Sequence, residues 1–178
     1  MEKSRKISKL CVLCIVLGVL SVATIVTLWA IALTDSSGVS APWDKYRLPD
    51  TLKPDYYNLT LWPRLKPNAQ GLYIFTGKST VVFKCMKETD LILIHSNKLN
   101  YTKWEDGNLA KLSALGSIKA PTIKTSWLKE TTQFLVVQLD DKLTAGESYK
   151  LYTEYVGELA DDLAGFYRSE YEEDGVKK

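Results

Sequence analysis

The first feature of the chain is an apolar stretch at residues 10–33 that contains no charged side chain. As a helix rising about 1.5 Å per residue, this stretch would span about 36 Å, and the hydrocarbon core of a membrane is about 30 Å thick. The pattern therefore predicts one transmembrane helix at 10–33, preceded by a short tail at 1–9.

Charged residues flank this stretch unequally. The nine residues before it contain four basic side chains and one acidic one, whereas Asp35 follows it. Because positive charge favours the cytosolic side, we expect a cytosolic tail, a type II anchor and an extracellular remainder. The small-x-small triplet Ala-Ile-Ala at 30–32 supports a competing interpretation, a cleaved signal peptide. The length of the apolar stretch favours the uncleaved anchor, whose partner is the lipid bilayer of the plasma membrane.

After a polar linker at 34–42, short apolar runs alternate with Gly, Pro, Asn and Asp. A continuous run such as 91–95 is typical of a strand buried on both faces, and alternation such as that at 78–86 is typical of one buried face. No amphipathic helix is evident. We expect an all-β domain at 43–178, a curved sheet or sandwich, with surface loops at 103–132. The expected strands are 56–62, 78–86, 91–95, 134–139 and 149–156.

The balance of charge excludes one class of function. The 178 residues include 23 basic and 21 acidic side chains, a net charge of +2. Residues 1–34 hold four of those basic groups and one acidic group, which leaves 19 basic and 20 acidic groups in the remainder. A nearly neutral domain has no face that could neutralise phosphates, so no nucleic-acid partner is expected.

The three cysteines are divided between the two sides of the membrane. Cys11 and Cys14 lie at the cytosolic end of the predicted span, where they are candidate S-acylation sites or ordinary apolar residues of the helix. Cys85 is the only cysteine of the predicted ectodomain, so no disulfide is expected within it. We expect Cys85 to be buried on the face of a strand.

Two acceptor triplets for N-glycosylation lie in the predicted ectodomain. They begin at Asn58 and Asn100, each followed two residues later by threonine. The predicted compartment makes both asparagines candidate glycosylation sites. Asn58 falls inside a predicted strand, so its side chain must point to solvent if a glycan is to fit.

No catalytic, metal-binding or substrate-binding residue is assigned. His95 is the only histidine, whereas a helical zinc site of the H-E-x-x-H kind needs two on one face. His95 lies in a predicted strand, so we expect a structural or surface histidine. No G-x-S-x-G elbow is present for serine-type catalysis.

Acidic and aromatic clusters receive structural interpretations as well. Asp161 and Asp162 could form a metal or amine subsite, but adjacent carboxylates on an extended chain point to opposite faces. We expect a turn there, with Arg168 balancing its charge, and a second solvated turn at 172–175. The tryptophans and tyrosines are expected in the core and at its rim, not in a platform for stacking ligands.

Several segments resemble the N-terminal β domain of membrane-bound zinc aminopeptidases of the aminopeptidase N type. They are WDKYRLPDTLKPDYYNLTL at 43–61, the spacing F-x-G-x-x-x-V-x-F at 75–83, IHS at 94–96 with KLNYT at 98–102, and GELADDLAGFYRSEY at 157–171. The last is the most specific, because strand periodicity does not require such a composition.

The resemblance implies a type II ectoenzyme that removes neutral N-terminal residues from peptides and can form a homodimer. In that family a catalytic domain follows the β domain, zinc is held by two His and a Glu, and a G-A-M-E-N loop binds the substrate amine. None of these motifs is present, so the chain is expected to be inactive alone, with no cofactor of its own. A further amine-binding glutamine would follow residue 178. Gln133 and Gln138 do not correspond to it, and the β domain is expected to be incomplete at its C-terminal end.

Three hypotheses remain at this point. In the first, the chain is the N-terminal part of a zinc aminopeptidase. If the chain is truncated, it could be retained in the endoplasmic reticulum instead of reaching the plasma membrane. In the second, it is a binding or adhesion ectodomain on a type II anchor. In the third, it acts in trans, by associating with full-length subunits.

Overall fold

The computed structural model describes residues 18, 20–25, 40–162 and 165–177. Residues 18 and 20–25 are helical and exposed, and most of the predicted span at 10–33, including Cys11 and Cys14, lies outside the described residues. Over the described part of the chain, no helix has the length and apolar character needed to cross a membrane. Residues Ala41–Lys178 form one compact unit, separate from Met1–Ser40.

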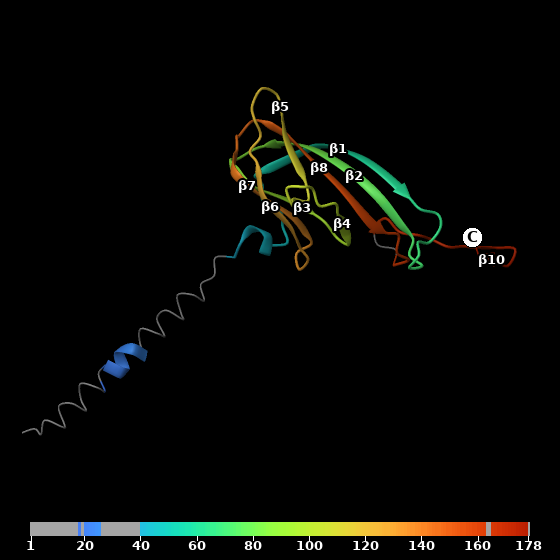
Figure 1. The fold of residues 1–178 in the computed structure, drawn as a ribbon, viewed down its shortest axis with the longest axis horizontal. Coiled ribbons are helices and arrows are strands. Elements are labelled where there is room, and N and C mark those ends of the chain that lie inside the picture. Colours follow the sequence, from blue (N-terminus) through green and yellow to red (C-terminus); the bar gives the residue numbers. More distant parts are fainter. Residues whose placement is uncertain (1–17, 19, 26–39, 163–164, 178) are drawn as a thin grey trace, which may run out of the picture. The chain divides into compact units, whose positions relative to one another are not determined.

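The larger of two facing sheets has five antiparallel strands (Figure 1). The order β1-β2-β8-β4 follows from the pairing of neighbours, and β5 pairs with β8 along another part of its length. This sheet, called the large sheet below, consists of β1 (Leu52–Pro63), β2 (Ile74–Cys85), β4 (Leu99–Tyr101), β5 (Lys111–Leu115) and β8 (Ser148–Glu158).

The smaller sheet has three antiparallel strands in the order β3-β7-β6. These strands are β3 (Thr89–His95), β7 (Phe134–Leu143) and β6 (Ile123–Lys129). A short 3-10 helix, η1 (Pro42–Asp44), lies beside this sheet, where the carbonyl of Trp43 accepts a hydrogen bond from Thr132 Oγ1 at 2.6 Å. In addition, the Lys129 ammonium lies 2.8 Å from the Asp44 carboxylate.

The core lies between the two sheets. Val81, Phe83, Tyr149 and Leu151 of the large sheet pack in one cluster with Ile92, Leu135 and Val137 of the small sheet. We call the side of the large sheet that carries these residues its inner face, and the opposite side its outer face. Leu91 and Leu93 belong to a second cluster with Phe134 and Val136, joined by Trp43 and Trp127. The continuous apolar run of β3 is therefore buried on both faces, as predicted.

The all-β prediction is confirmed for the described part of the chain, but one local prediction is wrong. The interval 103–132, expected to consist of loops, contains strands β5 and β6. The solvated turn expected at 172–175 is present, and it connects the two strands of a small hairpin, β9 (Glu172–Glu173) and β10 (Val176–Lys177). Its turn consists only of Asp174 and Gly175, both with positive φ, as a two-residue type I′ turn requires.

Candidate functional site at the end of the large sheet

The segment 157–171, the most distinctive of the sequence, leaves β8 and folds back over the end of the large sheet. Gly157 begins it because no other residue fits: a Cβ there would lie 2.3 Å from the Phe75 ring. Leu159 then becomes buried, and its N–H donates to the Tyr73 carbonyl at 2.8 Å. The segment is thus anchored by close packing and by a backbone hydrogen bond.

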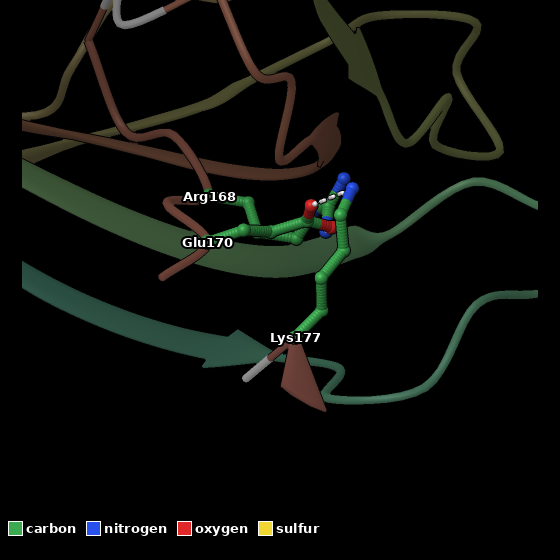
Figure 2. A network of polar contacts seen from close by, with 3 residues as sticks. All are labelled: Arg168, Glu170 and Lys177. Carbon is green, nitrogen blue, oxygen red and sulfur yellow. Dashed lines mark hydrogen bonds and ion pairs between the residues drawn. The ribbon is translucent and has the colours of Figure 1, made fainter. Parts of the chain in front are cut away.

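Arg168 connects the segment to the hairpin that follows it. Its N–H donates to the Ala160 carbonyl at 2.9 Å, and its guanidinium lies 4.4 Å from the centre of the Tyr73 ring. The guanidinium also pairs with the Glu170 carboxylate, whose other oxygen lies 3.2 Å from Lys177 Nζ. Figure 2 shows both cationic ends meeting at Glu170.

The two cations set the ionisation of Glu170. Its pKa is lowered, chiefly by the hydrogen bond from Arg168 and next by that from Lys177. The pKa of Arg168 is raised, first by the same hydrogen bond from its side chain to Glu170. The carboxylate is therefore ionised at neutral pH, and the network is a charge-assisted one.

A cavity of about 580 Å³ lies beside this network. Its walls combine apolar and aromatic side chains with charged ones: Pro63, Leu65, Tyr73, Leu159, Phe166, Tyr167, Arg64, Arg168, Glu170 and Lys177. Such a wall is suited to packing and ion pairing. Among the described lining residues there is no histidine, cysteine or close pair of carboxylates.

A second hollow, of about 240 Å³, lies between β1 and β3 and includes His95 in its lining. The lining is mainly apolar, with Leu52, Val81, Phe83 and Ile92 among its members. The His95 ring lies 4.6 Å from the Phe134 ring. Nowhere in the described part of the chain do three His, Cys, Asp or Glu side chains gather in a way that could hold a metal ion. The His95 side chain is exposed at the end of β3, and its ring lies beside that of Phe134.

The acidic pair at 161–162 lies in a bend, as expected, and a second basic residue besides Arg168 contributes to the balance of its charge. Asp162 Oδ2 lies 2.8 Å from Lys98 Nζ, whereas Arg168 is paired with Glu170. Lys98 can reach Asp162 because residues 96–98 turn at the neighbouring end of β3, with Lys98 at a positive φ. The pairing of Lys98 with Asp162 could not be predicted from the sequence. The expected role of Arg168 is supported for Asp161, whose charge contributes to the raised pKa of Arg168.

Cys85 is fully buried at the end of β2, as predicted. Its Sγ lies 3.1 Å from the Lys87 carbonyl and 3.7 Å from that of Leu143. Burial raises the pKa of the thiol, which keeps it protonated. A protonated, enclosed thiol is a poor nucleophile, so Cys85 is a core residue.

Asn58 and Asn100 are both exposed, in β1 and β4. Asn58 lies opposite Thr80 of β2, which lies opposite Tyr152 of β8, and Asn100 lies opposite Val156 of β8. Positions 152 and 156 are on the same side of β8, so both asparagines project from the outer face of the large sheet. Their accessibility is compatible with glycosylation.

Sequence reasoning missed the contacts of Arg168 and Lys177 with Glu170. The signal that could have located them is Asp174-Gly175, a dipeptide typical of two-residue hairpins, which brings Lys177 back towards Glu170. The pairing of Lys98 with Asp162 has no comparable local signal, because the two residues are far apart in the sequence.

Comparison with known proteins was consistent with this architecture. The model of the Peptidase M1 N-terminal domain family matches residues 53–178. Aminopeptidase N from Bos taurus is 56% identical over 139 residues, and that from Rattus norvegicus is 57% identical over 139 residues. Aminopeptidase Q from Homo sapiens is 30% identical over 141 residues. The matches cover 77–78% of this chain but only 14% of each relative, so the chain spans about a seventh of their length.

Proposed function

Because the chain belongs to the Peptidase M1 N-terminal domain family, we propose that it is the membrane-anchored β domain of a zinc metalloaminopeptidase. The observation that supports this most directly is the identity of more than half of 139 residues to aminopeptidase N from two mammals. In this proposal the domain lies outside the plasma membrane on a type II anchor, and the whole enzyme removes neutral N-terminal residues from peptides.

The contribution of this chain is a scaffold. Its two sheets share a cluster of buried apolar residues. The segment 157–171 is held at the end of the large sheet by the packing of Gly157 and by the backbone hydrogen bonds of Leu159 and Arg168. That end carries a mixed apolar and charged cavity, which is suited to packing against further protein. In this proposal, the β domain positions the rest of the enzyme relative to the membrane anchor.

Zinc and the groups that hydrolyse the peptide belong, in this proposal, to a separate catalytic domain of the whole enzyme. His95 is the only histidine of the chain, and the described residues contain no cluster of metal ligands. The residues present do not fit the zinc site of the family, so no catalytic step is assigned to them.

A domain exchange tests the proposal. The matching segment of bovine aminopeptidase N is replaced by that of this chain, and hydrolysis of an alanyl anilide is measured at the surface of cells expressing the chimera. We expect activity close to that of the parent enzyme, since a domain of the same family should support the same catalytic part. The chain expressed alone, with zinc added, should hydrolyse nothing.

Two outcomes would contradict the proposal. One is hydrolysis by the chain alone that a zinc chelator abolishes. The other is an inactive chimera together with a folded chain at the cell surface, which would favour a binding or adhesion ectodomain.

A further inference from the structure

The strand β1 is an edge strand of unusual exposure. In the part of the chain that the structure describes it pairs only with β2, through 11 of its 12 residues, with a register shift at Asp55, and none of the 12 residues is buried. The other edge of the large sheet is divided between β4 and β5, which have 3 and 5 residues. A long open edge presents a row of backbone donors and acceptors on which a second strand can pair.

The middle of β1 lacks the features that usually protect such an edge. Residues 56–62 contain no charge and no proline. Apolar side chains are exposed on both faces: Tyr57, Leu59 and Leu61 on the inner face are 53%, 53% and 41% exposed, and Trp62 on the outer face is 65% exposed. Seven uncharged residues of high strand propensity are enough to template edge-to-edge association.

The acceptor triplet at 58–60 occupies the centre of this unprotected stretch. Asn58 and Thr60 are both exposed and both project from the outer face. A second strand would lie about 4.8 Å from β1, and side chains directly opposite each other would be about 5 Å apart. A branched glycan on Asn58 does not fit at that spacing, least of all opposite the glycan of a second copy.

We propose that an N-linked glycan on Asn58 protects the edge of β1 and prevents it from pairing with β1 of a second copy of this chain. Since Lys53 and Asp55 lie near the start of β1, the glycan would protect the uncharged stretch 56–62 that follows them. This inference rests on the proposed extracellular topology, which exposes the triplet to glycosylation.

Asn100 provides a control within the same chain. It also projects from the outer face and also begins an acceptor triplet, but it lies in β4, which has only 3 residues. Such a short edge is a poor template for pairing. Loss of a glycan at Asn100 should therefore leave the association state unchanged.

The experiment uses the full chain, expressed in mammalian cells and solubilised in detergent. Four variants are compared with the parent chain: Asn58→Gln and Thr60→Ala, which destroy the first triplet in different ways, Thr60→Ser, which preserves it, and Asn100→Gln. Digestion with an endoglycosidase shows which sites are occupied, and sedimentation shows the association state. We expect dimers or larger species from the first two variants, and a parent-like state from the other two.

A fifth variant, Asn58→Lys, tests whether a charged side chain can protect the edge of β1 in the absence of the glycan. A lysine on the edge should restore the parent-like state without any sugar. The inference is overturned if Asn58→Gln and Thr60→Ala sediment like the parent, or if Asn58 is unoccupied in a parent chain that does not associate. If the inference is overturned while Asn100 carries a glycan, the proposed extracellular topology still holds. If neither Asn58 nor Asn100 carries a glycan, the proposed topology is overturned as well.

Discussion

The strands β1 and β2 have the same length and lie side by side, yet their surroundings differ. Each has 12 residues and many apolar side chains. In β2, Phe75, Val81, Val82, Phe83 and Cys85 are buried, whereas no residue of β1 is. Among the strands that the structure describes, β2 lies between two neighbours, while β1 has a neighbour on one side only. Burial here is decided by position in the sheet, because side chains of similar hydrophobicity are covered in one strand and exposed in the next.

The largest expected effect contrasts two tyrosines of the large sheet. Tyr149→Ala should destabilise the domain by about 3–5 kcal/mol, because it empties a fully buried site in the core. It also removes the hydroxyl that accepts a hydrogen bond from the Thr144 N–H at 2.9 Å. Tyr56→Ala in β1, where the side chain is 58% exposed, should change stability by no more than about 0.5 kcal/mol.

The measurement for both tyrosines is urea denaturation of the detergent-solubilised chain, followed by tryptophan fluorescence. Equal losses of stability would mean that β1 is covered as well as β8 is, which would break the contrast between core and edge.

A smaller effect is expected where the segment 157–171 leaves β8. Gly157→Ala places a Cβ against the Phe75 ring and should cost about 1–3 kcal/mol through overpacking. Ser79→Ala, on the same inner face but at a position that already has a side chain, should cost much less. Thermal denaturation compares the two variants. If the Gly157→Ala chain were as stable as the Ser79→Ala chain, the packing of Gly157 against the Phe75 ring would not be as close as the structure indicates.

The smallest effect concerns pH and the hairpin β9–β10. Arg168 and Lys177 lower the pKa of Glu170 below its ordinary value of 4.5. Because the folded pKa is lowered, the stabilisation is present above that ordinary value and is lost as the pH falls through the folded pKa. Hydrogen exchange of the hairpin amides should therefore be faster in Glu170→Gln than in the parent chain at pH 7, and the difference should disappear well below pH 4.5.

A matched control for this pH effect is Glu172→Gln, which alters an exposed carboxylate of the same hairpin. It should leave exchange nearly unchanged at every pH. A pH-independent difference for Glu170→Gln would contradict the role given to the ion pairs, and so would an equal effect of the control.

Local sequence patterns predicted the central strands well, because strands buried on one or both faces leave an alternating or a continuous apolar pattern. The continuous run at 91–95 and the alternation at 78–86 match β3 and the second half of β2. The strands β5 and β6 were missed because their members are mostly half-buried, with Ser113, Thr125 and Ser126 interrupting the apolar pattern. Their conformation depends on pairing with β8 and β7, which are distant in the sequence.

The candidate site was predicted less completely than the fold. Its distinctive segment at 157–171 was recognised, and so was the absence of a second histidine. The pairing of Lys98 with Asp162 was not, because these residues meet only where the start of β4 pairs with the end of β8. An ion pair across 64 positions leaves no periodic signal in the chain.

The sequence by itself determined the all-β class of the domain, the positions of its main strands and the chemistry that a single histidine excludes. These properties depend on residue type and short-range periodicity, which act within a few positions. Only the tertiary structure decided that β1 lies at an edge, that both acceptor asparagines share the outer face, and that Arg168 and Lys177 converge on Glu170. Those outcomes depend on which distant strands pair, and strand pairing is selected by the packing of the whole domain.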